Sequence, residues 1–593
     1  MKKRAVLGII KKKATVYNKE SQQMVCDILF ENAKVYNSAY RRFFDGYLAL
    51  RGQYIVCTGQ GEAPESLQAA QRVDLGGRAI VPGLIDSHMH IESSSLTPMA
   101  YANEAVRHGV TTIVSEPHEI ANVAGVAGID AMMAAGKGAP IDIYYGIPSS
   151  VPSTNDKLET AGGSIDEQQV LQLLQREGII CLGEVMNTRS VLTEPDGKAN
   201  RLIRAFRAAA PKLPVEGHVP RIVGTELAEY MLSGVDSDHT EHTLEELKDR
   251  WFFGFFVQLQ EKTLKREVVE YLAQHPELLD STALVTDDVM ADEMVHRGIL
   301  DDVLRLALEL GMPMEHAVYC AATTPAKRMR LYDRGQLRPG YLADFVILEK
   351  ETEFTVFATY KSGRCVYTMG DAYQPLPEVQ WPAALLNSVK LQPLYESDFV
   401  IRTEREGIVS CRTALVDPHR TQTQEVERKL EATDGELHFE GSGVNQYAVF
   451  ERYGINGNRG QGLVDGCTIR SGAVATTYSH DSHNLCVLGT NKADMAAAAN
   501  TVIAMKGGIA VVDGGSVIAT ARMPIGGILS DKAAHEFAVE MGAVTEAMKA
   551  RGYDHDDPIM SLCVLALPVS PALKFSDFGI VDVTKQQLVS LEK

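Results

Sequence analysis

Apolar and polar residues alternate with two different periods between residues 80 and 290. An apolar run at 84–85 is followed at 96–106 by apolar side chains three and four residues apart, and a β-branched run at 111–115 comes after Gly109. The three-to-four spacing is typical of an amphipathic helix, glycine of a helix end, and a short β-branched run of a strand. The pattern therefore predicts a strand, a helix and a second strand.

The same alternation continues along the chain. Helix-compatible segments at 166–176, 198–209 and 225–231 separate further apolar runs of strand length. Eight strands alternating with helices over about 250 residues predict an α/β fold, a (β/α)8 TIM-type barrel. Beyond the first two, the predicted strands are Ile141–Ile147, Ile179–Val185, Leu213–His218, Val235–His239, Trp251–Gln260 and Ala283–Asp287.

The segments on either side of the predicted barrel differ from it. Strand-like runs alternate with polar, glycine-bearing turns before it, and we expect the apolar run at 343–348 to pair with them. Prolines at 375, 377, 382 and 393 mark a linker, and a helix is predicted at 492–505. The expected domains are an N-terminal extension (1–24), a composite small β-sandwich domain (25–80 with 331–375), the barrel (81–330) and a C-terminal α/β domain (390–593).

The amino-acid composition limits which binding partners and which cellular compartment are expected. The 593 residues include 58 basic and 77 acidic residues, a net charge of −19, which argues against a nucleic-acid backbone as partner. Nine cysteines without a Cys-x-x-Cys pair favour a reducing compartment, so we expect the cytoplasm. No apolar stretch reaches the roughly 20 residues that span a bilayer. The N-terminal segment MKKRAVLGIIKKKATVYNK has a short apolar core, which predicts a surface helix rather than a secretory signal.

Ionisable side chains occur where the predicted strands end. His88 and His90 end the first strand, and because side chains alternate along a strand, both imidazoles point the same way. In a barrel of parallel strands the C-terminal ends lie on one rim, which carries the functional groups. Imidazoles and carboxylates gathered there predict a metal site rather than a packing coincidence. The residues at these ends are His88, His90, Glu116, His118, Glu119, Glu184, His218, His239, Asp287 and Asp288.

Other motifs give weaker signals. His118 and Glu119 begin an HExxH-like sequence, but position 122 is Asn, which excludes that zinc site, and the His-x-Glu at 90–92 lacks a partner P-C-x-x-C. Glu119 is alternatively a helix-start carboxylate favoured by the helix dipole. The segment SHDSHN (479–484) forms either a solvated loop or a loop over the barrel mouth that holds a substrate or binds a further ion.

Taken together, these motifs make the chain similar to the amidohydrolase superfamily and, within it, to the adenine deaminases. The resemblance covers nearly the whole chain after residue 25. It implies a barrel with two divalent metal ions, Mn(II) first and Fe(II) or Zn(II) as alternatives. The implied metal ligands are His88, His90, Glu184, His218, His239 and Asp287. The motifs that carry the resemblance are PGLIDSHMHIESS (82–94), GVTTIVSEPHEIANVAG (109–125), CLGEVMN (181–187), EGHVP (216–220), VTDD (285–288) and, in the last domain, YSHDSHNLCVLGTNKADM (478–495).

The resemblance also implies an activity, the hydrolytic deamination of adenine to hypoxanthine and ammonia in purine salvage. Glu184 is expected to bridge the ions, Asp287 to move the proton, and Glu119 to be the second candidate for proton transfer. Adenine is the expected small-molecule partner, and a homo-oligomer, a dimer or larger, is the expected assembly. The candidates for holding the substrate are Glu92, His118, His480, Asp481 and His483.

Two alternatives stay open. The chain has Thr240 after the histidine of the sixth strand and Gln260, Glu261 and Lys262 after the seventh, where the family pattern has an acidic residue and Arg-Glu-Gly. These differences motivate the first alternative, a related amidohydrolase that acts on another amino-heterocycle or on a cyclic amide. The second alternative is a catalytically inactive barrel that serves as a binding scaffold, and the complete set of six ligands argues against it.

Overall fold

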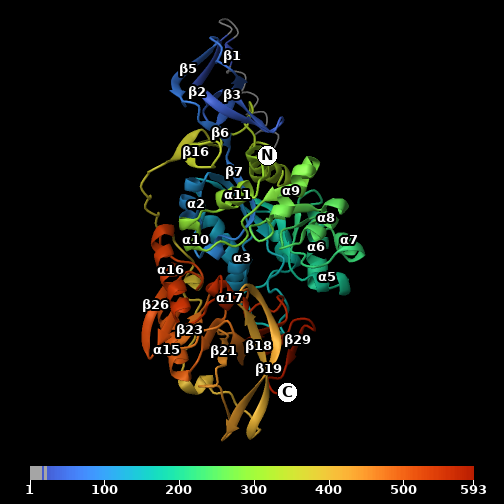
Figure 1. The fold of residues 1–593 in the computed structure, drawn as a ribbon, viewed down its shortest axis with the longest axis vertical. Coiled ribbons are helices and arrows are strands. Elements are labelled where there is room, and N and C mark those ends of the chain that lie inside the picture. The colour runs from blue at the N-terminus through green and yellow to red at the C-terminus, as the bar shows by residue number, and fades with distance from the viewer. Residues whose placement is uncertain (1–16, 19–22) are drawn as a thin grey trace.

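The computed structural model describes residues 17–18 and 23–593, arranged as three regions along the long axis (Figure 1). Strands of the N-terminal part form a sheet at one end, an α/β barrel lies in the middle, and a mixed sheet of the C-terminal part lies at the other end. The predicted N-terminal surface helix falls on residues 1–19, of which 17–18 form β1, and the others lie outside the described residues. Among the helices that are described, none is long and apolar enough to cross a membrane.

Within the described chain, the first sheet has nine strands and draws on both sides of the barrel. β6 pairs antiparallel with β15, so segments before and after the barrel share a sheet. The sequence predicts two separate strand-like runs at 27–30 and 34–36, but both lie in one strand, β2. Asn32 adopts a left-handed φ of 51° between them and the register shifts there, which bends the strand without ending it. The strands are β1 (Tyr17–Asn18), β2 (Gln23–Asn37), β3 (Arg42–Arg51), β4 (Tyr54–Gln60), β5 (Leu67–Asp74), β6 (Ala79–Pro82), β15 (Phe345–Leu348), β16 (Val356–Lys361) and β17 (Arg364–Thr368).

The middle region has parallel sheets of five and three strands, with helices between the strands. The two sheets contact each other at both edges. At one edge Asp236 N donates a hydrogen bond to Val215 O at 3.1 Å, and at the other edge Met89 forms an isolated β-bridge with Asp287. The result is a TIM-like α/β domain. The strands are β7 (Leu84–Met89), β8 (Val110–Ser115), β9 (Asp142–Ile147), β10 (Ile179–Val185), β11 (Val215–Gly217), β12 (Ser237–Asp238), β13 (Phe256–Leu259) and β14 (Thr282–Leu284). The α-helices are α2 (Pro98–Ala105), α3 (His118–Ala135), α4 (Glu167–Leu173), α5 (Thr188–Thr193), α6 (Lys198–Ala209), α7 (Gly224–Met231), α8 (Leu244–Phe253), α9 (Arg266–Gln274), α10 (Ala291–His296), α11 (Leu300–Glu309), α12 (Met314–Val318) and α13 (Thr324–Arg328).

One predicted barrel strand, Trp251–Gln260, is wrong over its first third. Residues 251–253 belong to α8, because a capping box between Thr243 and Glu246 starts that helix and Gly254, at a φ of 80°, ends it. The strand β13 follows this glycine. In contrast, the predicted helices at 198–209 and 492–505 have the same bounds in the structure as α6 and α15.

The C-terminal region is built on a mixed sheet in the order β20–β19–β18–β22–β21–β24–β23–β25–β26, beside a smaller antiparallel sheet of β27, β28 and β29. Its strands are β18 (Gly407–Asp417), β19 (Arg420–Thr433), β20 (Glu436–His438), β21 (Asn445–Phe450), β22 (Arg459–Gly466), β23 (Ala473–Thr476), β24 (Leu485–Gly489), β25 (Gly508–Asp513), β26 (Ser516–Arg522), β27 (Leu573–Ser576), β28 (Gly579–Asp582) and β29 (Gln587–Val589). Its α-helices are α14 (Ala383–Leu386), α15 (Lys492–Met505), α16 (Ala534–Ala550) and α17 (Pro558–Val564).

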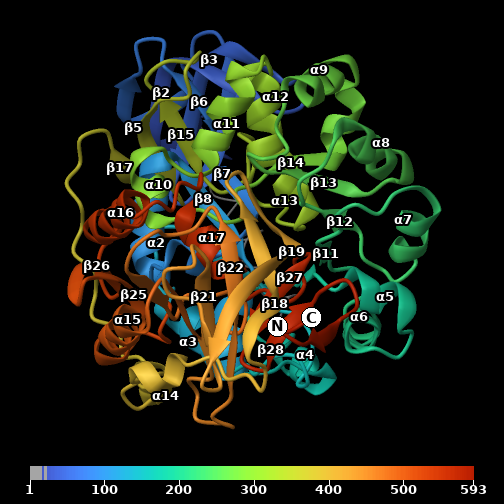
Figure 2. The ribbon, with the colours of Figure 1, turned by 60° about the horizontal axis from the view of Figure 1, so that its bottom comes forward.

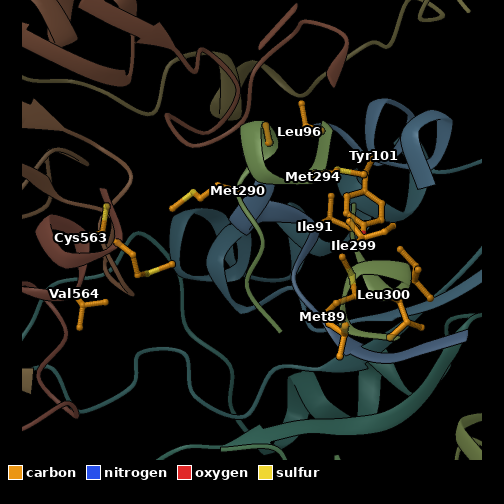
Figure 3. Packing of buried hydrophobic residues seen from close by; sticks show 14 of the residues in the cluster. Met89, Ile91, Leu96, Tyr101, Met290, Met294, Ile299, Leu300, Cys563 and Val564 are labelled. Carbon is orange, nitrogen blue, oxygen red and sulfur yellow. The ribbon is translucent and has the colours of Figure 1, made fainter. Parts of the chain in front are cut away.

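Apolar packing joins the barrel to the C-terminal region. Met290 and Met294 of the barrel and Cys563 and Val564 of α17 belong to one cluster of buried residues, part of which Figure 3 shows. The helix α10 packs against α16 along the same boundary (Figure 2). Burial of this apolar surface holds the C-terminal region against the barrel.

Candidate functional site

Six ionisable side chains meet at the ends of five barrel strands, and we call them the strand-end cluster. All six were predicted as metal ligands, and the structure brings all six together. The parallel strands position them, because each lies in or within three residues of the C-terminal end of its strand. They are His88 and His90 at the end of β7, Glu184 in β10, His218 after β11, His239 after β12 and Asp287 after β14.

Glu184 lies at the centre of the strand-end cluster. Its Oε1 is 3.4 Å from His90 Nε2, and its Oε2 is 3.0 Å from His218 Nδ1 and 3.3 Å from His239 Nε2. Asp287 Oδ1 is 3.5 Å from the Nε2 atoms of both His88 and His90. The two oxygens of Glu184 therefore face different imidazoles.

Hydrogen bonds outside the cluster orient its members. His90 Nδ1 lies 2.9 Å from the carbonyl oxygen of Glu116, and since a carbonyl only accepts, Nδ1 carries the ring proton and Nε2 presents its lone pair to the cluster. Gln260 Nε2 donates to Asp287 Oδ2 at 3.1 Å and to His239 O at 2.9 Å. Asp287 Oδ1 is thereby left to face His88 and His90.

Burial makes the negative charges of the cluster costly without a cation. Burial raises the pKa of Glu184, but hydrogen bonds from His218 and His239 hold this pKa well below its usual range. Burial also raises the pKa of Asp287, but the neighbouring histidines, His239 foremost, lower it further. Both carboxylates therefore stay ionised near neutral pH.

The donor atoms fit divalent metal ions. His88 Nε2 is buried and makes no hydrogen bond to any described residue. Donor atoms lie within 4.8 Å of one another in the group His88, His239 and Asp287 and again in the group Glu184, His218 and His239. Imidazoles and carboxylates without thiolates suit Mn(II), Fe(II) or Zn(II).

A second group of buried ionisable residues lies beside the first, and we call it the Glu119 cluster. Glu119 Oε1 is 2.6 Å from His480 Nδ1 and 3.3 Å from His118 Nε2, and Glu119 Oε2 contacts His483 Nε2. The solvated-loop interpretation of 479–484 is wrong, because every residue of this loop, which connects β23 to β24, is buried. The cluster consists of His118 and Glu119, at the start of α3, and His480, Asp481 and His483 from that loop.

His118 connects the two clusters. Its Nδ1 contacts Glu116 Oε2 and lies 3.6 Å from Glu184 Oε1, while its Nε2 faces Glu119 and lies 3.9 Å from Asp481 Oδ1. Burial lowers the pKa of this imidazole, but the carboxylates of Glu119 and Glu116 raise it well above its usual value. The two clusters are therefore electrostatically coupled through one ring.

Glu92, a candidate for substrate contact, is completely buried. Its Oε1 accepts a hydrogen bond from Ile120 N at 3.4 Å, in the first turn of α3. Burial raises the pKa of Glu92 to about 7. The side chain thus supports the start of the helix that carries His118 and Glu119.

Positions that depart from the expected pattern have different surroundings. Thr240 hydrogen-bonds Asp238, with Oγ1 to Oδ1 at 3.0 Å, and Asp238 in turn pairs with Arg250 at 2.6 Å. Gln260, by contrast, contacts the strand-end cluster through Asp287. Thr240 therefore contacts the ion pair of Asp238 and Arg250, which has a structural role, whereas Gln260 contacts Asp287 of the strand-end cluster.

The sequence indicated Glu116 and Asp288 at strand ends but gave them no role, and it did not indicate Arg452, which supports the Glu119 cluster. Glu116 contacts His118, and Asp288 Oδ1 accepts from Ser93 Oγ at 2.5 Å. Arg452 is completely buried, and it donates to the backbone oxygen of His483 and to Gly526 O at 2.7 Å. The strand-end position signalled the first two, but no local pattern in the sequence marks the arginine.

Comparison with known proteins defines the class of the molecule. Residues 79–371, which include the barrel, match the model of the amidohydrolase family. Residues 420–587 match the model of the adenine deaminase C-terminal domain. The chain therefore joins an amidohydrolase-type barrel to an adenine deaminase C-terminal domain.

Full-length relatives narrow the class further. The chain is 43% identical over 570 residues to adenine deaminase 2 of Shouchella clausii (strain KSM-K16), covering 96% of this chain and 99% of the relative. It is 41% identical over 577 residues to adenine deaminase of Clostridium perfringens (strain 13 / Type A), covering 96% and 99%. It is 37% identical over 568 residues to adenine deaminase 2 of Oenococcus oeni (strain ATCC BAA-331 / PSU-1), covering 95% and 98%. The chain belongs to the adenine deaminase family, as its motifs predicted.

Proposed function

We propose that this protein deaminates adenine hydrolytically, giving hypoxanthine and ammonia, and that it serves purine salvage. The observation that carries the proposal is the convergence of six imidazole and carboxylate donors on one rim, in a chain that matches proteins named adenine deaminase over 96% of its length. The convergence supplies the chemistry, and the match supplies the substrate.

The strand-end cluster holds two divalent metal ions in this proposal, with Mn(II) first and Fe(II) and Zn(II) as the alternatives. The two oxygens of Glu184 face separate groups of imidazoles, which supports two ions rather than one. When bound, divalent ions would lower the pKa of a water from 15.7 toward about 7 and so would make it a nucleophile at neutral pH. In the overall reaction the water oxygen forms a bond to C6 of the purine and the bond from C6 to the amino nitrogen breaks. One water proton goes to N1 of the ring and the other to the amino group, which leaves as ammonia.

Asp287 is the group that moves the proton. Its side chain is 12% exposed, whereas those of His88, His90 and Glu184 are at most 4% exposed, so Asp287 is more open to a substrate. Gln260 fixes one oxygen of Asp287 through a hydrogen bond. The lowered pKa of Asp287 keeps this carboxylate ionised, so it can accept the proton of the attacking water. The same carboxyl then returns the proton to the departing amine.

Glu119 is the second candidate for proton transfer, and its surroundings support a less direct role. Its carboxylate is completely buried between His480 and His483, and it faces the strand-end cluster through the ring of His118. We therefore propose that Glu119 positions His118. His118, together with Glu92, His480, Asp481 and His483, forms the wall of the substrate site.

The proposal also covers the domain division, the cellular location and the assembly of the protein. The division into an extension (1–24), a composite β-sandwich domain (25–80 with 331–375), a barrel (81–330) and a C-terminal α/β domain (390–593) is supported by the pairing of β6 with β15. A cytoplasmic location is supported by free cysteines. A homo-oligomer, a dimer or larger, is the proposed assembly, with adenine as the partner and neither nucleic acid nor membrane.

The test is ammonia release from adenine by the Mn(II)-loaded protein, beside a His88→Ala variant. The matched control is His275→Ala, which removes an exposed imidazole from the loop after α9. We expect robust release by the wild type and the control, and release at least about 10²-fold lower from His88→Ala.

A panel of other purines, pterins and cyclic amides is measured in parallel. Release from one of these and none from adenine would replace the proposal by the related-amidohydrolase alternative, which the departures at Thr240 and Gln260 motivate. Silence on the whole panel would favour the inactive scaffold.

A further inference from the structure

The Glu119 cluster has more carboxylate oxygens than hydrogen bonds to satisfy them. Both oxygens of Asp481 are buried and make no hydrogen bond to any residue that the structure describes. The oxygens of Glu119 are also buried, and they face the imidazoles of His480 and His483. Asp481 is completely buried. An ionised carboxylate removed from water costs several kcal/mol unless a cation or aligned donors compensate. The two oxygens of Asp481 therefore point to a missing positive partner.

The ring of His118 turns a lone pair toward these oxygens. Its Nδ1 contacts Glu116 Oε2, and because a carboxylate oxygen accepts, Nδ1 carries the proton of the neutral ring. Nε2 is then the unprotonated nitrogen, and it faces Glu119 Oε1 at 3.3 Å and Asp481 Oδ1 at 3.9 Å. A lone pair directed at two carboxylate oxygens is repulsive unless a cation lies between them.

His483 orients Glu119 from the other side. Ser479 N donates to His483 Nδ1 at 3.2 Å, so the ring proton lies on Nε2, which contacts Glu119 Oε2. Arg452 holds the backbone oxygen of His483 in turn. Glu119 is thereby fixed through one oxygen, and the other oxygen, Oε1, is left to the centre of the cluster, as outer partners commonly fix metal ligands.

We propose that His118, Glu119, His480 and Asp481 bind a further divalent cation, distinct from the ions of the strand-end cluster, and that this cation ties the loop at 479–484 to α3. One donor atom from each of the four residues lies within 4.8 Å of all the others. Two imidazoles and two carboxylates in a closed, four-coordinate set suit Zn(II).

The distances between donors support this geometry. Bonds of 2.0–2.2 Å around a tetrahedral ion place neighbouring donors about 3.3 to 3.6 Å apart. His118 Nε2 and Glu119 Oε1 are 3.3 Å apart, and His480 Nδ1 and Asp481 Oδ1 are 3.7 Å apart. The pair His480 Nδ1 and Glu119 Oε1, at 2.6 Å, widens on binding.

A proton is the rival occupant. A second proton on His118 or His480 would also place positive charge among the carboxylates, and the pKa of His480 is raised to about 10, since Glu119 and Asp481 outweigh the effect of burial. Counting metal ions separates the two, because a protonated cluster binds none.

The experiment measures metal content and metal position in the full-length protein. The protein is loaded with Mn(II), then with stoichiometric Zn(II), dialysed and analysed by plasma mass spectrometry. We expect about three ions per chain in the wild type and about two in Asp481→Asn and in His480→Gln, with the fourth ligand gone. The matched controls, Asp556→Asn and His419→Gln, alter an exposed pair of the same chemistry and should keep about three.

Anomalous scattering at the zinc edge gives the position and needs no variant. A peak bonded to His118 Nε2, Glu119 and Asp481 supports the proposal even if the variants fail to fold. Its absence from that place, a third ion elsewhere, or about three ions in Asp481→Asn overturns it.

The inference does not depend on adenine as the substrate. Loss of ammonia release with the third ion still in place would remove the proposed function and leave this site standing. Robust ammonia release with about two ions per chain would remove this site and leave the proposed function standing.

Discussion

The strand-end cluster and the Glu119 cluster are both groups of imidazoles and carboxylates, and His118 of the second cluster contacts Glu184 of the first, yet they are assembled differently. The first comes from strand ends of a single barrel. The second joins the start of α3 to a loop some 360 residues later, at 479–484. One is a product of fold periodicity, and the other is a product of packing between two regions.

Accessibility separates their roles. In the strand-end cluster the side chain of His218 is 34% exposed and that of Asp287 is 12% exposed. In the Glu119 cluster His480 is the most exposed side chain, at 7%. The first cluster is the more exposed of the two, so we propose that the chemistry takes place there. The second cluster, which is more buried, would mainly hold the wall of the site in place.

The largest effect is expected from Asp287→Asn. The amide cannot accept the proton of the attacking water, so kcat for adenine should fall by about 10²- to 10⁴-fold. The free energy of unfolding should change less than for a fully buried carboxylate, because the side chain of Asp287 is 12% exposed. Asp196→Asn, at a side chain that is 97% exposed, is the control, measured by ammonia release and by denaturant unfolding. An Asp287→Asn variant with more than half of wild-type kcat would remove Asp287 from the mechanism.

The opposite profile is expected from Glu119→Gln. Removing one charge from a fully buried ionic cluster leaves its partners uncompensated and should lower the free energy of unfolding by about 3 kcal/mol. The kcat should fall by only about 10-fold, since His118 loses its orientation while Asp287 remains. If kcat instead fell as far as in Asp287→Asn with stability unchanged, the division of roles between the clusters would be reversed.

The sequence predicted the strand-end cluster well for a physical reason. A repeating strand and helix of the right lengths leaves few ways to fold, and each ligand lies at a strand end, so finding the strands finds the residues. Errors stayed local: the capping box at Thr243 carried α8 through residues 251–253, which apolar content alone had assigned to a strand.

The Glu119 cluster was only half visible in the sequence. His480, Asp481 and His483 stood out as a dense polar segment, but nothing in a local pattern distinguishes a loop in water from a loop buried against another region. That distinction rests on the apolar contact between α17 and the barrel and on Arg452, whose partners lie far away in sequence. Long-range packing of this kind leaves no period to detect.

A third group of ionisable residues, His108 with Glu104 and Asp301, shows how protonation of one imidazole between two carboxylates affects the stability of the fold. Burial lowers the pKa of His108, but Asp301, at 3.1 Å, and Glu104, at 3.5 Å, raise it to about 9. The folded state therefore binds the proton more tightly than the unfolded state, whose pKa is about 6.5. The resulting stability is fully present below pH 6.5 and is lost as the pH rises through about 9.

Replacement by His108→Gln should flatten this dependence and cost on the order of 2 kcal/mol at pH 6. Chemical unfolding at pH 6 and pH 9.5, with His275→Gln as the exposed control, measures it. An equal loss at both pH values would mean that packing, and not the proton, stabilises this group.

The smallest effect is expected from Thr160→Val, on the same boundary as the Glu119 cluster but without a charge in the altered side chain. Thr160 Oγ1 donates to Asp577 Oδ2 at 2.6 Å and accepts from Asn456 Nδ2 at 2.9 Å. Asp577 keeps hydrogen bonds from Thr160 N, at 2.9 Å, and from Asn458, so the change should cost only about 1 kcal/mol in unfolding and leave kcat unchanged. A loss as large as that of Glu119→Gln would mean that the hydrogen bonds of an uncharged side chain hold the two regions together as strongly as the Glu119 cluster does. The Glu119 cluster would then have no special part in joining them.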